Sequence, residues 1–334
     1  MISTVSRVCS GSVPIPKRPA FPGFPRRALI LRHLTNFETL EGSTNGHLHA
    51  PKDRMRKVWT AILIVATASA ALAELKTLKP GFNLFSAQQD IQLGQEAAGQ
   101  VQQQLPVVNN AQLNGYLTNL LERLAKTEHG QSEFPYQIHA IPSKDVNAFA
   151  LPGGPIFVYT GLIQEANGEP ELAGVVAHEM THVKLRHGTH QASNANLIEL
   201  PLALAGKAAG DSLLGQVAQL GLGIGANSVL LKMSRSAESE ADYNGAQSMA
   251  EAGYNPVAMA QFFQRLETSH GKESRLAEFL SDHPSPGDRV KAVGEEIRQM
   301  PQRSYTANTG QFPAIKRLVS GIASPAASKP ISEK

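Results

Sequence analysis

The chain has 334 residues, of which 42% are hydrophobic and 18% are charged, so it can build a sizeable core and does not have a disordered composition. Residues 1–73 hold ten of the 31 basic and three of the 28 acidic residues, which leaves 21 basic and 25 acidic residues in the other 261. The body of the chain is therefore mildly acidic. This distribution excludes a basic nucleic-acid-binding surface, so we expect no nucleic-acid partner.

The first 73 residues are typical of a leader. Residues 1–54 are rich in Pro, Arg and Gly without periodicity, and we interpret them as a disordered extension upstream of Met55, a more plausible initiator. Residues 55–73 predict a signal peptide, with a positive start, an apolar run and small residues before Glu74. We expect cleavage near Ala73 and a periplasmic or otherwise exported protein. The alternative is a translated tail before an internal anchor.

Cysteine is absent after residue 73, because the one cysteine of the chain is Cys9. We therefore expect no disulfide framework, no thiol nucleophile and no cysteine-based zinc site in the exported protein. Such a protein must be stabilised by its hydrophobic core.

Two helices and a small sheet are predicted next. Apolar residues recur at helical spacing in 86–105, where Ser86 can cap the N-terminus, and again in 110–127. Three segments then have the apolar pattern of strands, and a Pro-Gly-Gly-Pro turn at 152–155 joins the last two. We expect an α+β fold with a small antiparallel sheet, whose strands lie in Tyr136–Ile141, Asn147–Leu151 and Ile156–Tyr159.

The rest of the chain is predicted to be mostly helical from Glu169 to about Met300. Residues 212–231 carry no charge, but four glycines interrupt them. We interpret this segment as a buried helix or a mobile apolar cover in preference to a membrane-touching segment. Residues 301–334 are rich in Ser, Pro, Ala and Lys and are expected to form a poorly ordered tail. The folded domain is thus expected to span 74–300.

Residues 178–182 read HEMTH, the pattern H-E-x-x-H. On a helix His178 and His182 lie one turn apart on one face and can bind the same metal ion, and Glu179 can reach a water on that ion. The apolar flanks, an acidic start and Gly188 at the end favour a helix here. Chance produces this pattern in about one chain in a hundred of this size.

A catalytic zinc ion needs three protein ligands and an open position. In residues 234–246, Glu238 and Asp242 are four apart and share a helix face, whereas Glu240 faces elsewhere. Glu238 is therefore the natural third ligand, and Asp242 can accept a hydrogen bond from a ligand imidazole and set its tautomer. Alone, these acidic residues would be interpreted as a solvated face.

The segment NAFALPGG, residues 147–154, could present a strand edge to an extended peptide through Asn147, Ala148 and Phe149. An ordinary core strand fits the local sequence equally well. The segment DHPSPGDR, residues 282–289, predicts a loop that enters a helix, with His283 on extended backbone before a proline. His283 could latch the metal, donate a hydrogen bond to the developing oxyanion, or only cap the helix.

The other histidines are assigned no catalytic role. His187 is expected to lie off the ligand face and to cap the helix C-terminus or bond a carbonyl. A surface position is the default for His190. The isolated histidines are interpreted as structural or exposed; they are His129, His139 and His270.

NAFALPGG, HEMTH, SRSAESEAD and DHPSPGDR occur in an order that resembles the zinc metallopeptidase family of the CAAX prenyl proteases, HtpX, Oma1 and periplasmic BepA. The resemblance covers about residues 147–289, and the helix at 86–105 resembles that of soluble periplasmic members. The sequence shows neither the clear transmembrane helices of the multi-span members nor a tetratricopeptide-like extension, which leaves substrate and partner open. The resemblance implies a gluzincin fold with one zinc ion on His178, His182 and Glu238, Glu179 as general base, Asp242 behind the site and His283 near the metal.

The predicted function is that of an exported zinc endopeptidase that hydrolyses peptide bonds with metal-activated water and Glu179 as base. Family analogy suggests envelope protein quality control, with protein or peptide substrates and a peripheral-membrane or outer-membrane assembly partner. One alternative is a proteolytically idle, zinc-bound assembly chaperone, which Glu179 disfavours because a structural site needs no base. A second alternative, hydrolysis of a non-peptide bond, is disfavoured by the edge-strand segment.

Overall fold

The structure, a computed structural model, describes residues 77–195, 233–268, 279, 282–283, 289–300 and 303–323. The predicted leader and the uncharged segment at 212–231 lie outside the described residues, so the expectations for them stay predictions. No helix within the described ranges is long and apolar enough to cross a membrane.

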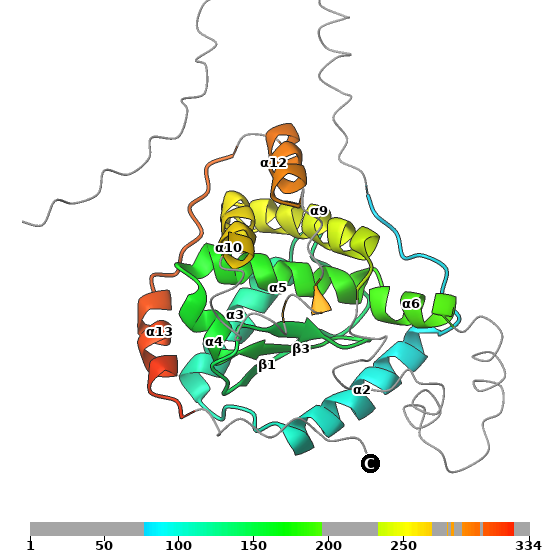
Figure 1. Cartoon of the computed structure of the whole chain (residues 1–334), viewed down its shortest axis with the longest axis horizontal. Helices are drawn as coiled ribbons and strands as arrows, with labels where there is room; N and C mark the ends of the chain where they lie inside the picture. Colours follow the sequence, from blue (N-terminus) through cyan, green and yellow to red (C-terminus); the bar gives the residue numbers. More distant parts are fainter. Residues whose placement is uncertain are drawn as a thin grey trace, which may run out of the picture. The chain divides into compact units, whose positions relative to one another are not determined.

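The described part of the chain is mostly helical with a three-stranded sheet, which confirms the α+β fold class (Figure 1). In chain order the elements are α2 (Ala87–Gln104), α3 (Ala111–Ala125), β1 (Gln137–Ile141), β2 (Ala148–Ala150), β3 (Pro155–Tyr159), α4 (Thr160–Glu165), α5 (Glu169–Lys184), α6 (His187–Ala195), α9 (Arg235–Glu251), α10 (Val257–Thr268), α12 (Arg289–Gln299) and α13 (Phe312–Ser320).

The two N-terminal helices begin at side-chain caps. The Ser86 hydroxyl accepts from the Gln89 amide and the Gln89 side chain accepts from the Ser86 amide, which makes a capping box at the start of α2. Asn110 caps α3 in a similar way by accepting from the Leu113 amide. These caps satisfy backbone amides that have no partner inside the helix.

The sheet has the order β1-β3-β2 and is mixed. β2 and β3 are antiparallel, as expected, and Gly153 and Gly154 turn the chain between them with φ values of 74° and 130° that favour glycine. The prediction of an antiparallel sheet is wrong for β1, which pairs parallel to β3. The reason is that β2 does not lie next to β1. The chain forms β2 at the opposite edge of the sheet and then turns back to form β3 between the two, so β3 runs parallel to β1.

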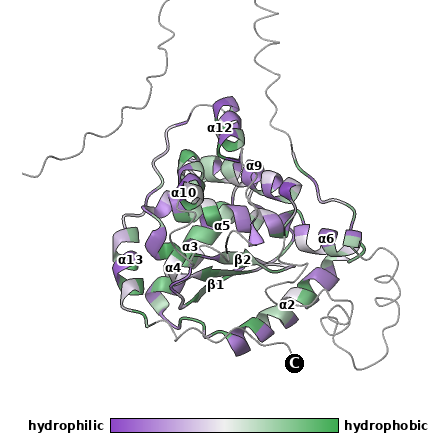
Figure 2. Cartoon of the chain, viewed as in Figure 1, coloured by the Kyte–Doolittle hydropathy of each residue, from purple (hydrophilic) through white to green (hydrophobic). Residues whose placement is uncertain are grey.

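The two faces of the sheet contact different helices. Phe149, Phe157 and Tyr159 pack with Leu93 and Ala97 of α2, which alternates green and purple along its length as an amphipathic helix does (Figure 2). The opposite face carries smaller side chains and packs in the main core with α3 and α5. Because alternate strand residues point to opposite faces, one short hairpin serves both layers.

The buried helix α5 packs along α9, and this pair positions the functional residues (Figure 1). A Cβ atom on Gly245 of α9 would lie 3.2 Å from the backbone nitrogen of His178. This is tighter than an ordinary van der Waals contact, so a side chain there would require a small local shift. Glycine therefore suits the close approach of the two helices at this position.

The expectation of a poorly ordered tail after residue 300 is wrong for α13. Phe312, Ile315 and Val319 of this helix are buried in the main core. Their spacing of three and four residues makes one apolar stripe, which binds the helix to the domain although the surrounding composition is polar.

Candidate metal centre

Three of the predicted site residues lie on α5, in its buried C-terminal half. The helix starts with Gly168 as N-cap, a proline in its first turn, and Glu169 and Glu171 near its positive end. His178, Glu179 and His182 are at most 3% exposed. Buried polar side chains of this kind need partners, and those partners come from α9, α6 and the segments that contain Asp282, His283 and Arg289.

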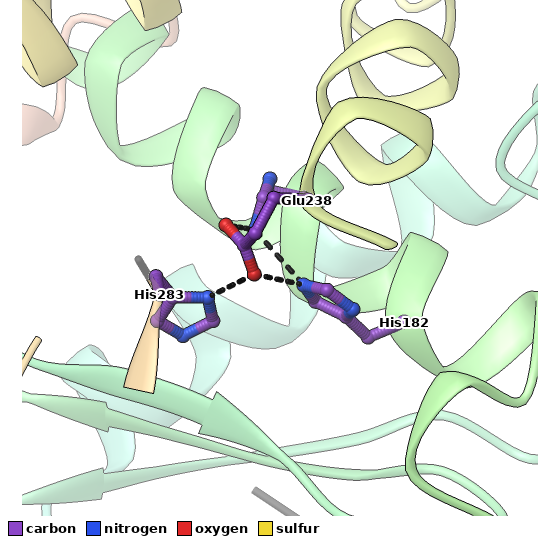
Figure 3. A group of neighbouring side chains, drawn as sticks. His182, Glu238 and His283 are labelled. Atoms are coloured by element: carbon purple, nitrogen blue, oxygen red, sulfur yellow. Dashed lines mark hydrogen bonds and ion pairs between the residues drawn. The ribbon is translucent and has the colours of Figure 1, made fainter. Parts of the chain in front are cut away.

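The imidazoles of α5 meet the carboxylate of Glu238 from α9. The Nε2 atoms of His178 and His182 lie 2.9 Å apart, and each is 3.4 Å from an oxygen of Glu238. Nδ1 of His283 lies 3.0 Å from Glu238 Oε1 (Figure 3). One donor atom from each of these four buried residues falls within 4.8 Å of all the others.

This donor set fits a divalent transition metal. Two imidazoles and a carboxylate are typical protein ligands of zinc, and the donor atoms of a tetrahedral zinc site with bonds of about 2.1 Å lie roughly 3.4 Å apart. Glu179 Oε1 and His283 Nε2 lie 3.4 Å from one another, and neither makes a hydrogen bond to a described residue. Buried polar atoms without such a bond are groups that a bound ion or water can satisfy.

A carboxylate and a guanidinium lie behind His178. Asp242 Oδ1 is 3.0 Å from His178 Nδ1, so Asp242 can accept the Nδ1 hydrogen and leave Nε2 free. Arg289 donates from Nε and, at 2.7 Å, from Nη2 to Asp242, and its Nη1 lies 3.1 Å from Glu238 Oε2. The guanidinium also lies 3.9 Å from the ring centroid of Phe263.

Arg289 has no role among the residues predicted from the sequence, although it is the last residue of the DHPSPGDR segment. The only available signal was a charged residue at the start of a helix, and that pattern is common on solvated surfaces. In the structure the side chain is 4% exposed and contacts two acidic residues of the site. A buried positive charge of this kind offsets the charges of Glu238 and Asp242.

His187 lies against His182, which corrects the expectation that it caps the helix or bonds a carbonyl. Its Nδ1 is 2.8 Å from His182 Nδ1, and its Nε2 is 3.2 Å from Glu240 Oε2. The expectation assumed a continuous helix. The chain instead breaks at Arg186, whose φ of 59° is unusual for a residue with a side chain, and the break returns His187 to His182.

The electrostatic environment shifts the pKa values of Glu179 and Glu238 in opposite directions. Burial raises the pKa of Glu179 above its usual range, although His283 and His178 oppose this effect. Burial also favours the protonated form of Glu238, but His283 and His178 outweigh it and hold the pKa of Glu238 well below its usual range. Glu238 is therefore the ionised carboxylate, suited to a cation, and Glu179 is the more basic of the two.

The comparison with protein families agrees with this geometry. The sequence model of "Peptidase family M48" matches residues 111–297, more than half of the chain. The chain belongs to peptidase family M48. The matched region of this M48 chain contains the cluster of His178, His182, Glu238 and His283 together with Glu179.

Curated relatives carry peptidase names. The chain is 32% identical over 193 residues to the mitochondrial metalloendopeptidase OMA1 of Schizosaccharomyces pombe, which is 58% of this chain and 56% of the relative. It is 30% identical over 220 residues to the beta-barrel assembly-enhancing protease of Escherichia coli, or 64% and 44% of the two chains. Metalloprotease LoiP of the same species is 30% identical over 192 residues, or 56% and 72%. The match thus spans about half the length of the first two relatives.

The residues expected to bind substrate lie at the start of β2 in this M48 domain. Asn147 is buried and donates from Nδ2 to Asp282 Oδ2 at 3.2 Å, next to His283. The side chains of Ala148 and Phe149 are buried on opposite faces of the sheet. Only the backbone of β2, which lies at one end of the strand order, is therefore suited to pair with a peptide.

The remaining histidines lie away from the cluster where they are described. His129 is buried with its Nδ1 2.6 Å from Glu251, and the ring of His139 packs near Phe157. His190 is half-buried, with Nδ1 2.5 Å from the carbonyl oxygen of Phe82. His270 lies outside the described residues.

Proposed function

We propose that this chain is a zinc-dependent endopeptidase. The observation that supports it is the carboxylate of Glu179 in the same buried cluster as His178, His182 and Glu238. A metal site with a purely structural role needs no such base, so Glu179 favours an enzyme over an idle assembly chaperone. The names of the relatives, metalloendopeptidase and protease, support the same conclusion.

The proposed ligands of one zinc ion per chain are His178, His182 and Glu238. When bound, zinc supplies a Lewis acid that polarises the scissile carbonyl and lowers the pKa of a water toward about 7. Glu179 accepts a proton from the attacking water and delivers it to the leaving amine. The raised pKa of Glu179 suits this exchange, because a base works best when its pKa is near the working pH.

Asp242 and the edge of β2 complete the proposed site. Asp242 holds the imidazole of His178 through Nδ1, so that Nε2 keeps its lone pair for the metal. The backbone at Asn147, Ala148 and Phe149 pairs with an extended segment of substrate, which places the scissile bond beside Glu179.

His283 is proposed as a latch of the resting enzyme. Its two nitrogens lie 3.0 Å from Glu238 and 3.4 Å from Glu179, so the ring occupies space that a water and a substrate need. The competing role is that of a hydrogen-bond donor to the developing oxyanion. The latch is favoured because the ring already contacts both carboxylates.

The place of action and the substrates are further parts of the proposal. Residues 55–73 support export with cleavage near Ala73. A relative named for beta-barrel assembly supports envelope protein quality control, with protein or peptide substrates and an outer-membrane assembly partner.

Replacement of Glu179 by Gln tests the proposed role of Glu179 as the base of a peptidase. The amide has the size and polarity of the carboxylate but cannot take up the proton, so Glu179→Gln is expected to keep near-wild-type zinc content and to lose casein cleavage by about a hundredfold or more. Glu122→Gln, a change at an exposed residue of α3, is the matched control and should cleave as the wild type does. An active Glu179→Gln chain would exclude the proposed mechanism.

A further inference from the structure

We infer that His187 and Glu240 are a positioning pair that holds His182 in the tautomer a metal ion requires. The inference concerns the side of His182 that faces away from the cluster, and it rests on the proposed zinc site. Zinc ligands need an imidazole nitrogen with a free lone pair, and the hydrogen bond at the other nitrogen decides which one is free.

The contacts form one continuous chain of three side chains. The Nδ1 atoms of His182 and His187 are 2.8 Å apart, with the ring planes at 72°, and His187 Nε2 is 3.2 Å from Glu240 Oε2. His182 and His187 are buried, and Glu240 is 42% exposed at its side chain. The row of hydrogen-bonded side chains therefore leads from His182 in the metal cluster to the protein surface at Glu240.

The chemistry of the outer group sets the direction of every hydrogen bond. A carboxylate only accepts, so His187 Nε2 donates to Glu240. A neutral His187 then has its lone pair on Nδ1, where it accepts from His182 Nδ1. His182 Nε2 is left without a hydrogen, and this is the atom that lies 2.9 Å from His178 Nε2 and 3.4 Å from Glu238.

The backbone conformation between α5 and α6 allows His187 to contact His182. In a continuous helix His187 would lie about 140° around the axis from His182 and could not reach it. Arg186 instead adopts the left-handed conformation, and its side chain donates to Asp90 Oδ2 at 2.7 Å and to the Phe85 carbonyl at 2.6 Å. Contacts to a distant part of the chain thus hold a conformation that a non-glycine residue seldom adopts.

The α9 helix supplies both a ligand and the outer anchor. Glu238 faces α5, and Glu240, two positions later, faces the side where His187 begins α6. A shift of α9 would therefore disturb Glu238 and the hydrogen bond behind His182 together. This shared origin explains how two carboxylates on different faces of one helix can serve one site.

Zinc dissociation constants of full-length variants, measured by competition with a chromogenic chelator, test the inference. His187→Phe keeps a ring of similar size but no hydrogen bond, and we expect zinc binding to weaken about 10- to 100-fold. In His187→Asn the side-chain oxygen can accept at the place of Nδ1, so most of the affinity should return. His129→Phe is the matched control, because it alters another buried histidine paired with a carboxylate and should leave zinc affinity unchanged.

Glu240, the half-exposed outer residue of this hydrogen-bonded row, allows a second test that does not disturb the core. Glu240→Ala should weaken zinc binding less than His187→Phe, by about threefold to tenfold, and Glu240→Gln, which keeps an acceptor oxygen, should stay within about twofold of the wild type. Cobalt absorption spectra should change in His187→Phe and not in His129→Phe.

Two results would overturn the inference. The first is wild-type zinc affinity in His187→Phe or, if that chain does not fold, in Glu240→Ala. The second is a loss that appears as a lower melting temperature of the metal-free protein, with no recovery of affinity in His187→Asn, because a purely structural role would give that pattern. If the wild-type chain itself does not bind zinc, the proposed zinc site fails and takes the inference with it.

Discussion

His178 and His182 lie one turn apart on α5, yet the groups behind them differ. Asp242 backs His178, and Arg289 neutralises Asp242 in turn, with both side chains at most 4% exposed. Behind His182 there is another imidazole, and the chain of contacts ends at a half-exposed carboxylate.

The difference has an energetic consequence. Buried charges destabilise a fold when one partner is removed, whereas a neutral imidazole and a half-exposed carboxylate leave no such unpaired charge. We therefore expect the His178 side to contribute to fold stability and metal affinity together. The His182 side should contribute mainly to metal affinity.

The largest effect is expected at Glu238, which contacts both histidines. Glu238→Ala removes a proposed ligand and should weaken zinc binding by more than about a hundredfold, beyond the usual range for a residue that acts behind a ligand. Glu240→Ala, two positions away on the same helix, should lose about tenfold at most. Equal zinc loss in the two variants, measured by elemental analysis after dialysis, would mean that the helix facing is wrong.

Asp242→Ala sharpens the contrast between the two sides. It frees the tautomer of His178 and removes one partner of buried Arg289, so zinc affinity should fall about 10- to 100-fold and the metal-free protein should lose about 3 kcal/mol of unfolding free energy. His187→Phe should match the loss of affinity with a clearly smaller loss of stability. Chemical denaturation of both metal-free variants checks this, and equal destabilisation would remove the distinction.

The smallest expected change concerns His283, which belongs to the cluster but to neither of the two groups behind His178 and His182. If it is a latch, His283→Ala should raise casein cleavage several-fold, since the ring no longer occupies the place of water and substrate. A donor to the oxyanion predicts a loss of roughly a hundredfold instead. A helix cap predicts little change beyond about 1 kcal/mol of stability. Steady-state cleavage rates at equal zinc content separate the three outcomes.

Local spacing accounts for the parts of the molecule that were predictable. The Ser86 cap and the shared face of His178 and His182 follow from helix geometry over a few residues. The catalytic and metal-binding roles of these and the other site residues stay predictions.

Long-range contacts account for what was missed. The parallel pairing of β1 depends on which side of β3 the strand β2 occupies, and the sequence of β1 does not predict that position. The place of His187 depends on a break at Arg186, which Asp90 stabilises from 96 residues away. The apolar stripe on α13 that includes Ile315 lies in a segment of mostly polar composition, so a prediction from composition alone missed the helix.

Anomalous diffraction at the zinc absorption edge, from crystals of the protein grown with zinc, tests the central claim most directly. The account predicts one strong peak per chain, about 2.0–2.2 Å from His178 Nε2, His182 Nε2 and a carboxylate oxygen of Glu238. The carboxylate of Glu179 should lie near the peak without binding the metal, as expected of a base. A map with no peak at this cluster, or with its strongest peak elsewhere on the chain, would contradict the account.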